Sequence, residues 1–144
     1  MRTLGFFLLC FLQLSCTGQI AKKINGVSFV ASREKVTQEH VDELMQVHAN
    51  HAAVMPFGFI RDINSPEIIH NTDRQWFGET KNGAKQYIEL LHKNGIQVMV
   101  KPQIWIWKGE FTGTLTMNSE EDWEALEKSY DAFILTYAEL AEES

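Results

Sequence analysis

Alternating apolar and polar positions predict three β-strands in this chain. Along residues 97–107 every second side chain is apolar, and most are β-branched: Val98, Val100, Pro102, Ile104 and Ile106. The positions between them are polar, charged or aromatic. A period of two residues is typical of a strand with two different faces. Shorter apolar runs at residues 24–32 and 51–60 predict the other two strands.

Helical periodicity follows each predicted strand, within residues 37–50, 82–95 and 119–144. Thr37 and Ser119 are suited to N-caps, and Asn94-Gly95 is a typical helix stop. The side chains expected to face inward are, helix by helix, Val41, Leu44, Met45 and His48, then Tyr87, Ile88 and Leu91, then Trp123, Leu126, Tyr130, Ile134, Tyr137 and Ala141. A polar loop from residue 61 to about residue 80 separates the second strand from the second helix.

The order strand–helix, repeated three times, predicts a parallel sheet with right-handed crossovers. The front of residues 97–107 fits the inside of a closed barrel, whose C-terminal mouth lines the active site. In the alternative, an open doubly wound sheet, helices cover both faces and strands are apolar on both sides. No glycine-rich phosphate loop supports that alternative. We therefore expect an α/β fold of the parallel (β/α)8 TIM-barrel type, with the first three βα units present.

Two prolines occupy equivalent places in a weak internal repeat. Residues 54–59 resemble residues 100–105, with Pro56 and Pro102 at the same position in each. Proline inside a central strand removes a ladder hydrogen bond. We therefore expect both prolines at strand ends, where the chain opens into a loop.

The acidic composition argues against a nucleic acid partner. The 144 residues carry a formal net charge of −6, with 44% hydrophobic and 22% charged residues, which is a globular composition. No run of lysine or arginine supplies the basic patch that nucleic acid binding requires. A partner held by non-ionic contacts fits this surface better.

The first residues resemble an export signal. Arg2 precedes an apolar run that is too short to span a bilayer. Ser15-Cys16 resembles the end of a bacterial lipoprotein signal, with Cys16 as the lipidated residue; cleavage after Gly18 is the alternative. We expect a signal peptide over residues 1–18 and an exported protein of the bacterial cell envelope. It would be held by a lipid anchor at most, or be periplasmic or secreted.

Both cysteines, Cys10 and Cys16, lie in this signal region, so we expect no disulfide and no thiolate metal site in residues 19–144. The five histidines, His40, His48, His51, His70 and His92, form no HExxH pattern. Solvated or core positions explain them without a ligand role. We therefore expect no metal and no cofactor.

Three tryptophans at predicted strand ends or loops suit sugar binding. Trp76, Trp105 and Trp107 offer flat indole faces for the C–H faces of sugar rings, while core or rim packing is the alternative. Lys101 and Gln103 would hold hydroxyl groups on the same face. For Lys101 a structural ion pair and a Schiff-base lysine remain alternatives, the latter implying a lyase.

A glycosidase also needs two carboxylates across the scissile bond. Asp62, Glu79 and Glu110 fall in loops at the predicted mouth, but none follows a strand directly. Glu79 is the most suggestive of them. Arg61 follows the second strand, where it either binds substrate or anchors its loop.

Several blocks resemble glycoside hydrolase family 113, whose members are β-mannanase-like TIM barrels. The resemblance runs from about Asn25 to the end of the chain and rests on these blocks: Phe57-Gly58-Phe59, Gln75-Trp76-Phe77-Gly78-Glu79, Lys101-Pro102-Gln103-Ile104-Trp105, Trp107, Thr112-Gly113 and the Trp123…Tyr130…Ala138-Glu139-Leu140-Ala141 helix. The family often has histidine or another aromatic residue where this chain has Gln75.

This resemblance implies retaining hydrolysis of β-linked mannose polymers, with catalytic glutamates at the ends of strands four and seven. Neither position lies in these residues, so we expect the catalytic residues beyond residue 144 and no hydrolysis by residues 19–144 alone. The substrate-binding residues carried over are Trp76, Lys101, Gln103, Trp105 and Trp107. The expected partner is an oligo- or polysaccharide. The alternative is an exported, non-catalytic carbohydrate-binding lipoprotein.

Overall fold

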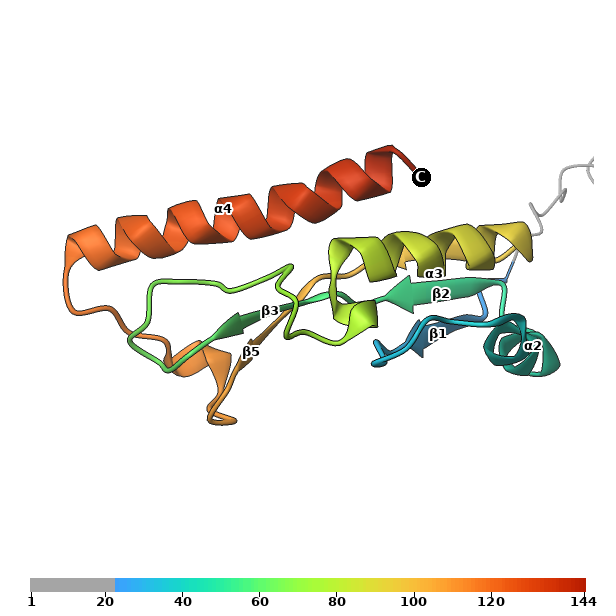
Figure 1. The fold of residues 1–144 in the computed structure, drawn as a ribbon, viewed down its shortest axis with the longest axis horizontal. Helices are drawn as coiled ribbons and strands as arrows, with labels where there is room; N and C mark the ends of the chain where they lie inside the picture. The colour runs from blue at the N-terminus through green and yellow to red at the C-terminus, as the bar shows by residue number, and fades with distance from the viewer. Residues whose placement is uncertain (1–22) are drawn as a thin grey trace, which may run out of the picture.

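A computed structural model describes residues 23–144 as one layer of parallel strands with helices packed on it (Figure 1). The predicted signal peptide and the lipidation site at Cys16 lie outside the described residues. Residues 23–144 contain five short strands: β1 (Gly26–Phe29), β2 (His51–Val54), β3 (Phe57–Ile60), β4 (Gln97–Val100) and β5 (Gln103–Ile106).

All strand pairs are parallel, as the strand–helix order predicts. Strand β2 lies between β1 and β4, and β3 pairs with β5. The last residue of β2, Val54, pairs with Val100, and the first residue of β3, Phe57, pairs with Gln103. The same register therefore continues from β2–β4 into β3–β5. Strands β2 and β4 thus continue into β3 and β5 as one pair of long strands with an interruption, and β1 lies beside β2.

The interruption lies at the two prolines and corrects the expectation that each proline ends its strand. The chain stays extended beyond Pro56 and Pro102 for another four-residue strand. Lys101 N donates to Val54 O at 2.8 Å and Gln103 N donates to Pro56 O at 2.9 Å, so pairing continues across the break. Because proline lacks an N–H, only the bond that Pro56 would donate is lost. The internal repeat places both prolines at the same level.

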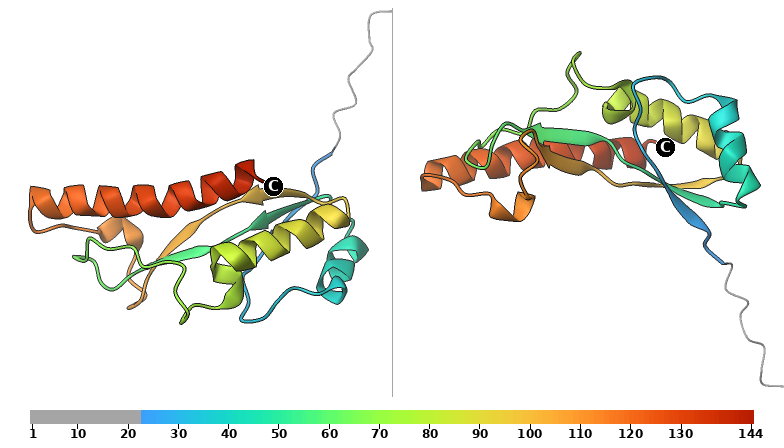
Figure 2. Two further views of the ribbon diagram at one scale, coloured as in Figure 1. Left: turned by 45° about the horizontal axis from the view of Figure 1, so that its top comes forward. Right: turned by 90° about the horizontal axis from the view of Figure 1, so that it is seen from below.

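Helix α3 (Lys81–Lys93) covers the back of the sheet, and the sequence predicted its buried face correctly. Tyr87, Ile88 and Leu91 are each 1% exposed or less. Thr80 caps the helix by accepting a hydrogen bond from Gly83 N, and Gly95 takes the left-handed φ of +75° just after its end. Figure 2 shows α3 beside the β2–β4 part of the sheet.

Helix α2 (Gln38–Gln46) begins after Thr37, as predicted, and contributes less to the core than its pattern suggested. Val41 is fully buried, whereas Met45 is 47% exposed and His48 is exposed. The helix ends at Gln46, and His48 takes a left-handed φ of 56° in the turn into β2. His48 therefore lies outside the helix whose inner face it was expected to share.

Helix α4 (Glu120–Glu142) buries only part of the predicted face: Tyr137 is 1% exposed and Leu126 packs against the core, whereas Ala141 is exposed. Its buried residues are Phe133, Tyr137 and Leu140, all in its second half. Trp123 and Tyr130, which the sequence placed inward, are 38% and 45% exposed. Ser119 caps the helix by accepting a hydrogen bond from Asp122 N. The buried face is rotated slightly about Tyr137, so that Phe133 and Leu140 are buried in place of the predicted Ile134 and Ala141.

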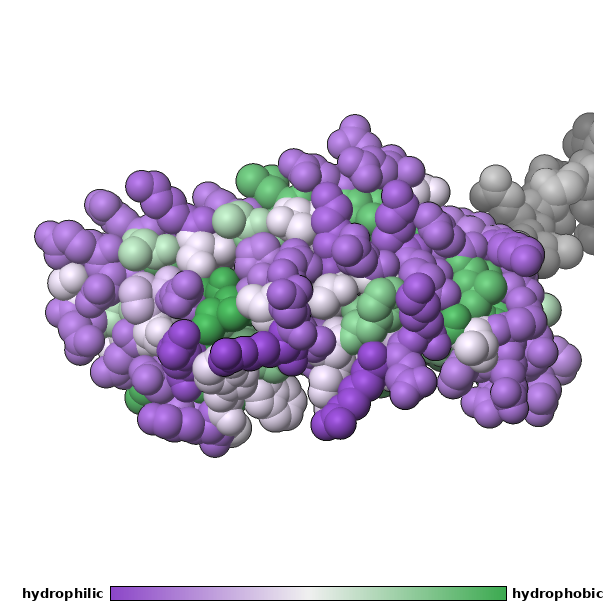
Figure 3. All heavy atoms as spheres, in the orientation of Figure 1, coloured by the Kyte–Doolittle hydropathy of each residue, from purple (hydrophilic) through white to green (hydrophobic). Residues whose placement is uncertain are grey.

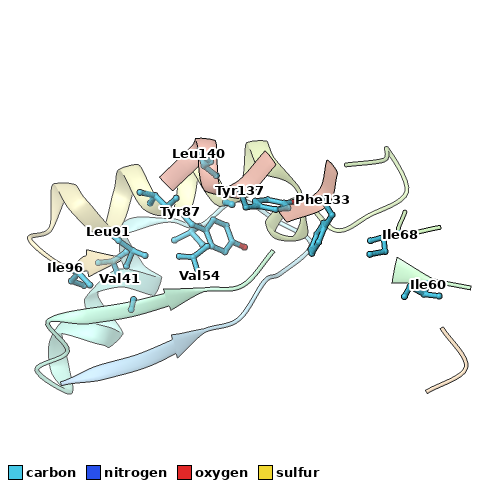
Figure 4. Close-up of a cluster of buried hydrophobic side chains, with 14 of the residues drawn as sticks. Val41, Val54, Ile60, Ile68, Tyr87, Leu91, Ile96, Phe133, Tyr137 and Leu140 are labelled. Carbon is cyan, nitrogen blue, oxygen red and sulfur yellow. The ribbon is translucent and has the colours of Figure 1, made fainter. Parts of the chain in front are cut away.

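The core lies between the sheet and helices α3 and α4 (Figure 4). Tyr87 and Leu91 of α3 face Val54 of β2, while Phe133 and Tyr137 of α4 extend the core toward Ile60. The surface in the orientation of Figure 1 is mostly hydrophilic, with separate hydrophobic patches (Figure 3). Within residues 23–144 no helix is both long and apolar enough to span a bilayer.

Candidate sugar-binding cleft

The sheet presents an exposed front, opposite its helix-covered back. The strand residues that face forward, Met99, Trp105 and Trp107, are 58%, 54% and 55% exposed. They alternate with the partly buried Val98, Val100 and Ile104 and the buried Ile106. Lys101 is exposed on the same face, and Gln103 is partly buried. The predicted alternation of residues 97–107 is therefore confirmed. This front is the face that lines the interior of a parallel barrel.

A cleft of about 600 Å³ lies where β3 and β5 end, and we call it the aromatic cleft. Residues from both strand ends and from the loop before η2 (Phe77–Glu79) line it: Phe59, Arg61, Ile69, Thr72, Asp73, Arg74, Gln75, Trp76, Glu79 and Trp107. The segments that follow β3 and β5 leave the sheet at the C-terminal ends of these strands (Figure 2). That is the end at which parallel α/β folds bind ligands.

The structure brings Trp76 and Trp107 together in this cleft. Trp76 is 44% exposed, and Trp107 is 55% exposed and packs against Phe59 with 6.3 Å between ring centroids. An arginine accompanies each indole. The Arg33 guanidinium carbon lies 5.1 Å from the Trp76 ring centroid, and that of Arg61 lies 5.7 Å from the Trp107 ring centroid. Cation–π contacts of this kind hold the rings in place.

The loop that carries Trp76 is fixed to the fold by Gln75 and Asn71. Gln75 donates to Phe57 O at 2.9 Å and accepts from Thr72 N at 3.0 Å. Asn71 Oδ1 accepts from Lys81 N at 2.6 Å and from the Tyr137 hydroxyl at 3.3 Å. The sequence alone indicated only that Gln75 replaces the histidine or aromatic residue that the family often has at this position. In the fold its amide connects this loop to β3.

The remaining predicted site residues lie outside the aromatic cleft. Trp105 is exposed on β5, two residues before Trp107, and pairs with Phe59 in the register of β3 and β5. Gln103 turns its amide toward its own strand, donating to Lys101 O at 3.4 Å and Pro102 O at 3.3 Å. In an unbroken ladder the residue at position 56 would donate its N–H to the Lys101 carbonyl, but Pro56 has no N–H to donate. Gln103 thus partly repairs the proline break, and its role as a ligand contact stays a prediction.

Glu79 is positioned by backbone rather than by a catalytic partner. One carboxylate oxygen accepts a hydrogen bond from Trp76 N at 3.0 Å, which fixes the first turn of η2. Burial raises the pKa of Glu79 above its ordinary value, and this hydrogen bond opposes the shift. Burial likewise raises the pKa of the nearby Tyr137 phenol. Asp62 and Glu110 do not line the cleft.

We expect the Glu79→Gln variant to be at least as stable as the parent protein at about pH 7 and equal to it at about pH 4. Because the folded-state pKa of Glu79 is raised, its stabilising contribution is complete below the ordinary value of 4.5 and is lost as pH rises through the folded pKa. Glutamine keeps an acceptor for Trp76 N. Urea midpoints of both proteins at the two pH values measure the difference. A parent protein that is more stable than the variant at neutral pH would contradict this sign.

Sequence patterns did not identify Arg33 as a site residue. Arg33 lies after β1, where no motif marks it, and reaches Trp76 only because two backbone bonds tie its loop to η2. These bonds run from Gly78 N to Ser32 O at 2.9 Å and from Phe77 N to Arg33 O at 3.3 Å. Within residues 23–144 no group of three or more His, Cys, Asp and Glu side chains is arranged to hold a metal.

The comparison with protein families identifies one match. The model of Glycoside Hydrolase Family 113 matches residues 29–144. This range begins at the end of β1 and includes every residue of the aromatic cleft. No curated protein matches the chain.

Solved structures of this family share the fold. A GH113 β-mannanase from Alicyclobacillus acidocaldarius, in complex with ManMIm, is 20% identical with a TM-score of 0.68, over 85% of this chain and 42% of that chain. A second structure, of a GH113 β-1,4-mannanase, is 16% identical with a TM-score of 0.66, over 84% and 42%. This chain therefore spans 42% of the length of each. The likeness confirms the predicted α/β fold of the TIM-barrel type.

Proposed function

Because this chain belongs to glycoside hydrolase family 113, as its motifs predicted, we propose that the protein hydrolyses a β-linked polysaccharide of the mannan class. The two solved relatives, a β-mannanase and a β-1,4-mannanase, support this substrate class. Hydrolysis with retention needs two carboxylates about 5–5.5 Å apart. We propose that glutamates on barrel strands outside residues 23–144 supply them, and that residues 23–144 bind the sugar.

The observation that carries this proposal is the pair of exposed indoles in one cleft at the strand ends. Trp76 and Trp107 belong to different segments of the chain, yet both line the aromatic cleft. A sugar ring is apolar on its faces and polar at its edges, so it stacks on an indole while its hydroxyl groups reach polar neighbours. Thr72, Asp73 and Gln75 offer such polar neighbours.

The front of the sheet extends this binding surface toward the barrel interior. Trp105 lies on β5 and Lys101 lies in the segment just before β5. Both are exposed on the front of the sheet, next to the cleft. We propose that they contact the sugar units nearest the reaction centre. Gln103 would contribute only after its amide leaves the Lys101 and Pro102 carbonyls.

Trp107→Ala is expected to weaken binding of mannotetraose by about tenfold or more, because a buried aromatic face contributes roughly 1.5–3 kcal/mol. Calorimetric titration of the full-length protein measures this affinity, and release of reducing ends measures hydrolysis. Trp123→Ala is the matched control, since Trp123 lies on α4 and is 38% exposed but does not line the cleft. Equal affinity in the Trp107 variant and the parent would contradict the stacking role.

The same assay separates hydrolysis from sugar binding alone. Release of reducing ends from mannan supports the hydrolase proposal. Binding of mannotetraose without any release would favour the non-catalytic carbohydrate-binding protein instead. If the protein neither binds mannotetraose nor releases reducing ends, both functions are rejected.

A further inference from the structure

Arginine is distributed unevenly over the described residues. Residues 23–144 contain three arginines, Arg33, Arg61 and Arg74, and eight lysines. Arg61 and Arg74 line the aromatic cleft, and Arg33 lines an adjoining hollow of about 570 Å³ that shares Thr72, Asp73 and Gln75 with it. Every arginine of the described chain therefore lies around one site, in a sequence whose net charge is −6.

These guanidinium groups have no anionic partner within residues 23–144. The only ion pair there joins Lys81 to Glu139 at 3.9 Å, and no arginine side chain there makes a hydrogen bond within 3.5 Å. Arg33 and Arg61 instead rest on the indoles of Trp76 and Trp107. Their planar donor groups remain available to a ligand.

Arginine in this setting favours a carboxylate over a hydroxyl group. The guanidinium presents its N–H donors in a rigid fork that matches carboxylate geometry in two parallel hydrogen bonds. A neutral sugar uses single donors, which the Thr72 hydroxyl and the second N–H of the Gln75 amide can provide. Two acids of the cleft, Asp73 and Glu79, oppose an anion, but the cations around the cleft and the hollow, namely the three arginines and Lys81, outnumber them.

We propose that the aromatic cleft and its adjoining hollow bind an acidic saccharide, namely a β-linked chain of mannose-type units that carry carboxylate groups. The proposal rests on the proposed function, because it assumes a saccharide in the cleft. The indoles stack on the ring faces, and Arg33, Arg61 and Arg74 bind the carboxylates. The combination of stacking and ion pairing sets the specificity of this end of the binding surface.

The direct test compares two tetrasaccharides with the same backbone. β-1,4-linked mannotetraose is neutral, whereas the β-1,4-linked mannuronate tetrasaccharide has a carboxylate in place of each primary alcohol. Titration calorimetry of the full-length protein is expected to give about five- to tenfold tighter binding of the mannuronate at about 0.01 M salt. The advantage should disappear at about 1 M salt, where the screening length is ~3 Å.

Arginine variants show which groups cause the preference. Arg33→Gln and Arg61→Gln are each expected to reduce the ratio of mannuronate to mannotetraose affinity by about threefold or more. Arg61→Lys keeps the charge and loses the fork, so it should retain only part of the ratio. Lys128→Gln is the matched control, because Lys128 is an exposed cation of α4 outside the cleft, and its ratio should equal that of the parent.

The outcomes separate this inference from the function on which it rests. If mannotetraose binds as tightly as the mannuronate, the acidic-saccharide proposal is wrong and the mannan proposal stands. If neither sugar binds, both fail. Tighter binding of a single-stranded oligonucleotide than of either sugar would also overturn the inference, because it would assign the arginines and aromatic rings to nucleic acid.

Discussion

Phe133→Ala is expected to destabilise the protein by about 3–5 kcal/mol, because it removes a large side chain from the centre of the core. Phe133 is 1% exposed, and its ring makes edge contacts with His70 and Tyr137, each at 5.4 Å between centroids. It also covers Gly58, at whose position any added Cβ would lie 2.9 Å from the ring. Alanine would leave a cavity between α4 and the β3–β5 half of the sheet. The urea midpoint of the full-length protein measures the loss.

Leu135→Ala is the matched control on the same helix. Leu135 is 56% exposed, so its truncation removes little packing and should cost less than about 1 kcal/mol. Equal losses for the two variants would mean that α4 is not held to the sheet through Phe133. Because His70 belongs to the loop that leads to Trp76, the Phe133 variant should also bind mannotetraose more weakly.

Gly83→Ala is expected to cost about 3 kcal/mol, although alanine is normally the better helix former. A Cβ at residue 83 would overlap the Phe77 carbonyl oxygen and lie 2.8 Å from Gly78 Cα. That carbonyl cannot move away, because it accepts hydrogen bonds from Thr80 N at 3.1 Å and from the Thr80 hydroxyl at 2.8 Å. The clash therefore falls on rigid backbone at the start of α3.

Gly26→Ala provides the control with the same chemical change. A Cβ there would meet nothing closer than 3.9 Å, so we expect a neutral result or a gain of about 0.4–1 kcal/mol. If Gly83→Ala proves as harmless as Gly26→Ala in urea unfolding, the close packing of η2 on α3 is wrong. Since η2 follows Trp76 directly, this packing also positions the aromatic cleft.

Patterns of short period made much of the fold predictable. The two-residue alternation of residues 97–107 identified the exposed front of β4 and β5, because successive side chains of a strand point to opposite faces. Thr37, Ser119 and Asn94-Gly95 marked helix ends through their local backbone preferences. The face of α3 through Tyr87 and Leu91 was predictable because this helix has a single apolar stripe.

Where two local patterns competed, the sequence did not decide between them. Helix α4 has apolar residues on both sides of Tyr137, and only contact with β4 and α3 decided that Phe133 and Leu140 are buried rather than Ile134 and Ala141. Pro56 and Pro102 predicted strand ends, yet the parallel register around them keeps the chain extended. A ladder tolerates one missing donor when the flanking bonds remain.

The sequence by itself determined the α/β order, the parallel strands and the family, because periodicity and short motif blocks are local properties of the chain. Trp76 and Trp107 were recognisable as sugar-binding candidates for the same reason. Only the tertiary structure placed these two in one cleft, separated Trp105 and Gln103 from it, and brought Arg33 to Trp76. Such convergence depends on strand register and on how loops are tied down, and both arise from hydrogen bonds between residues distant in the sequence.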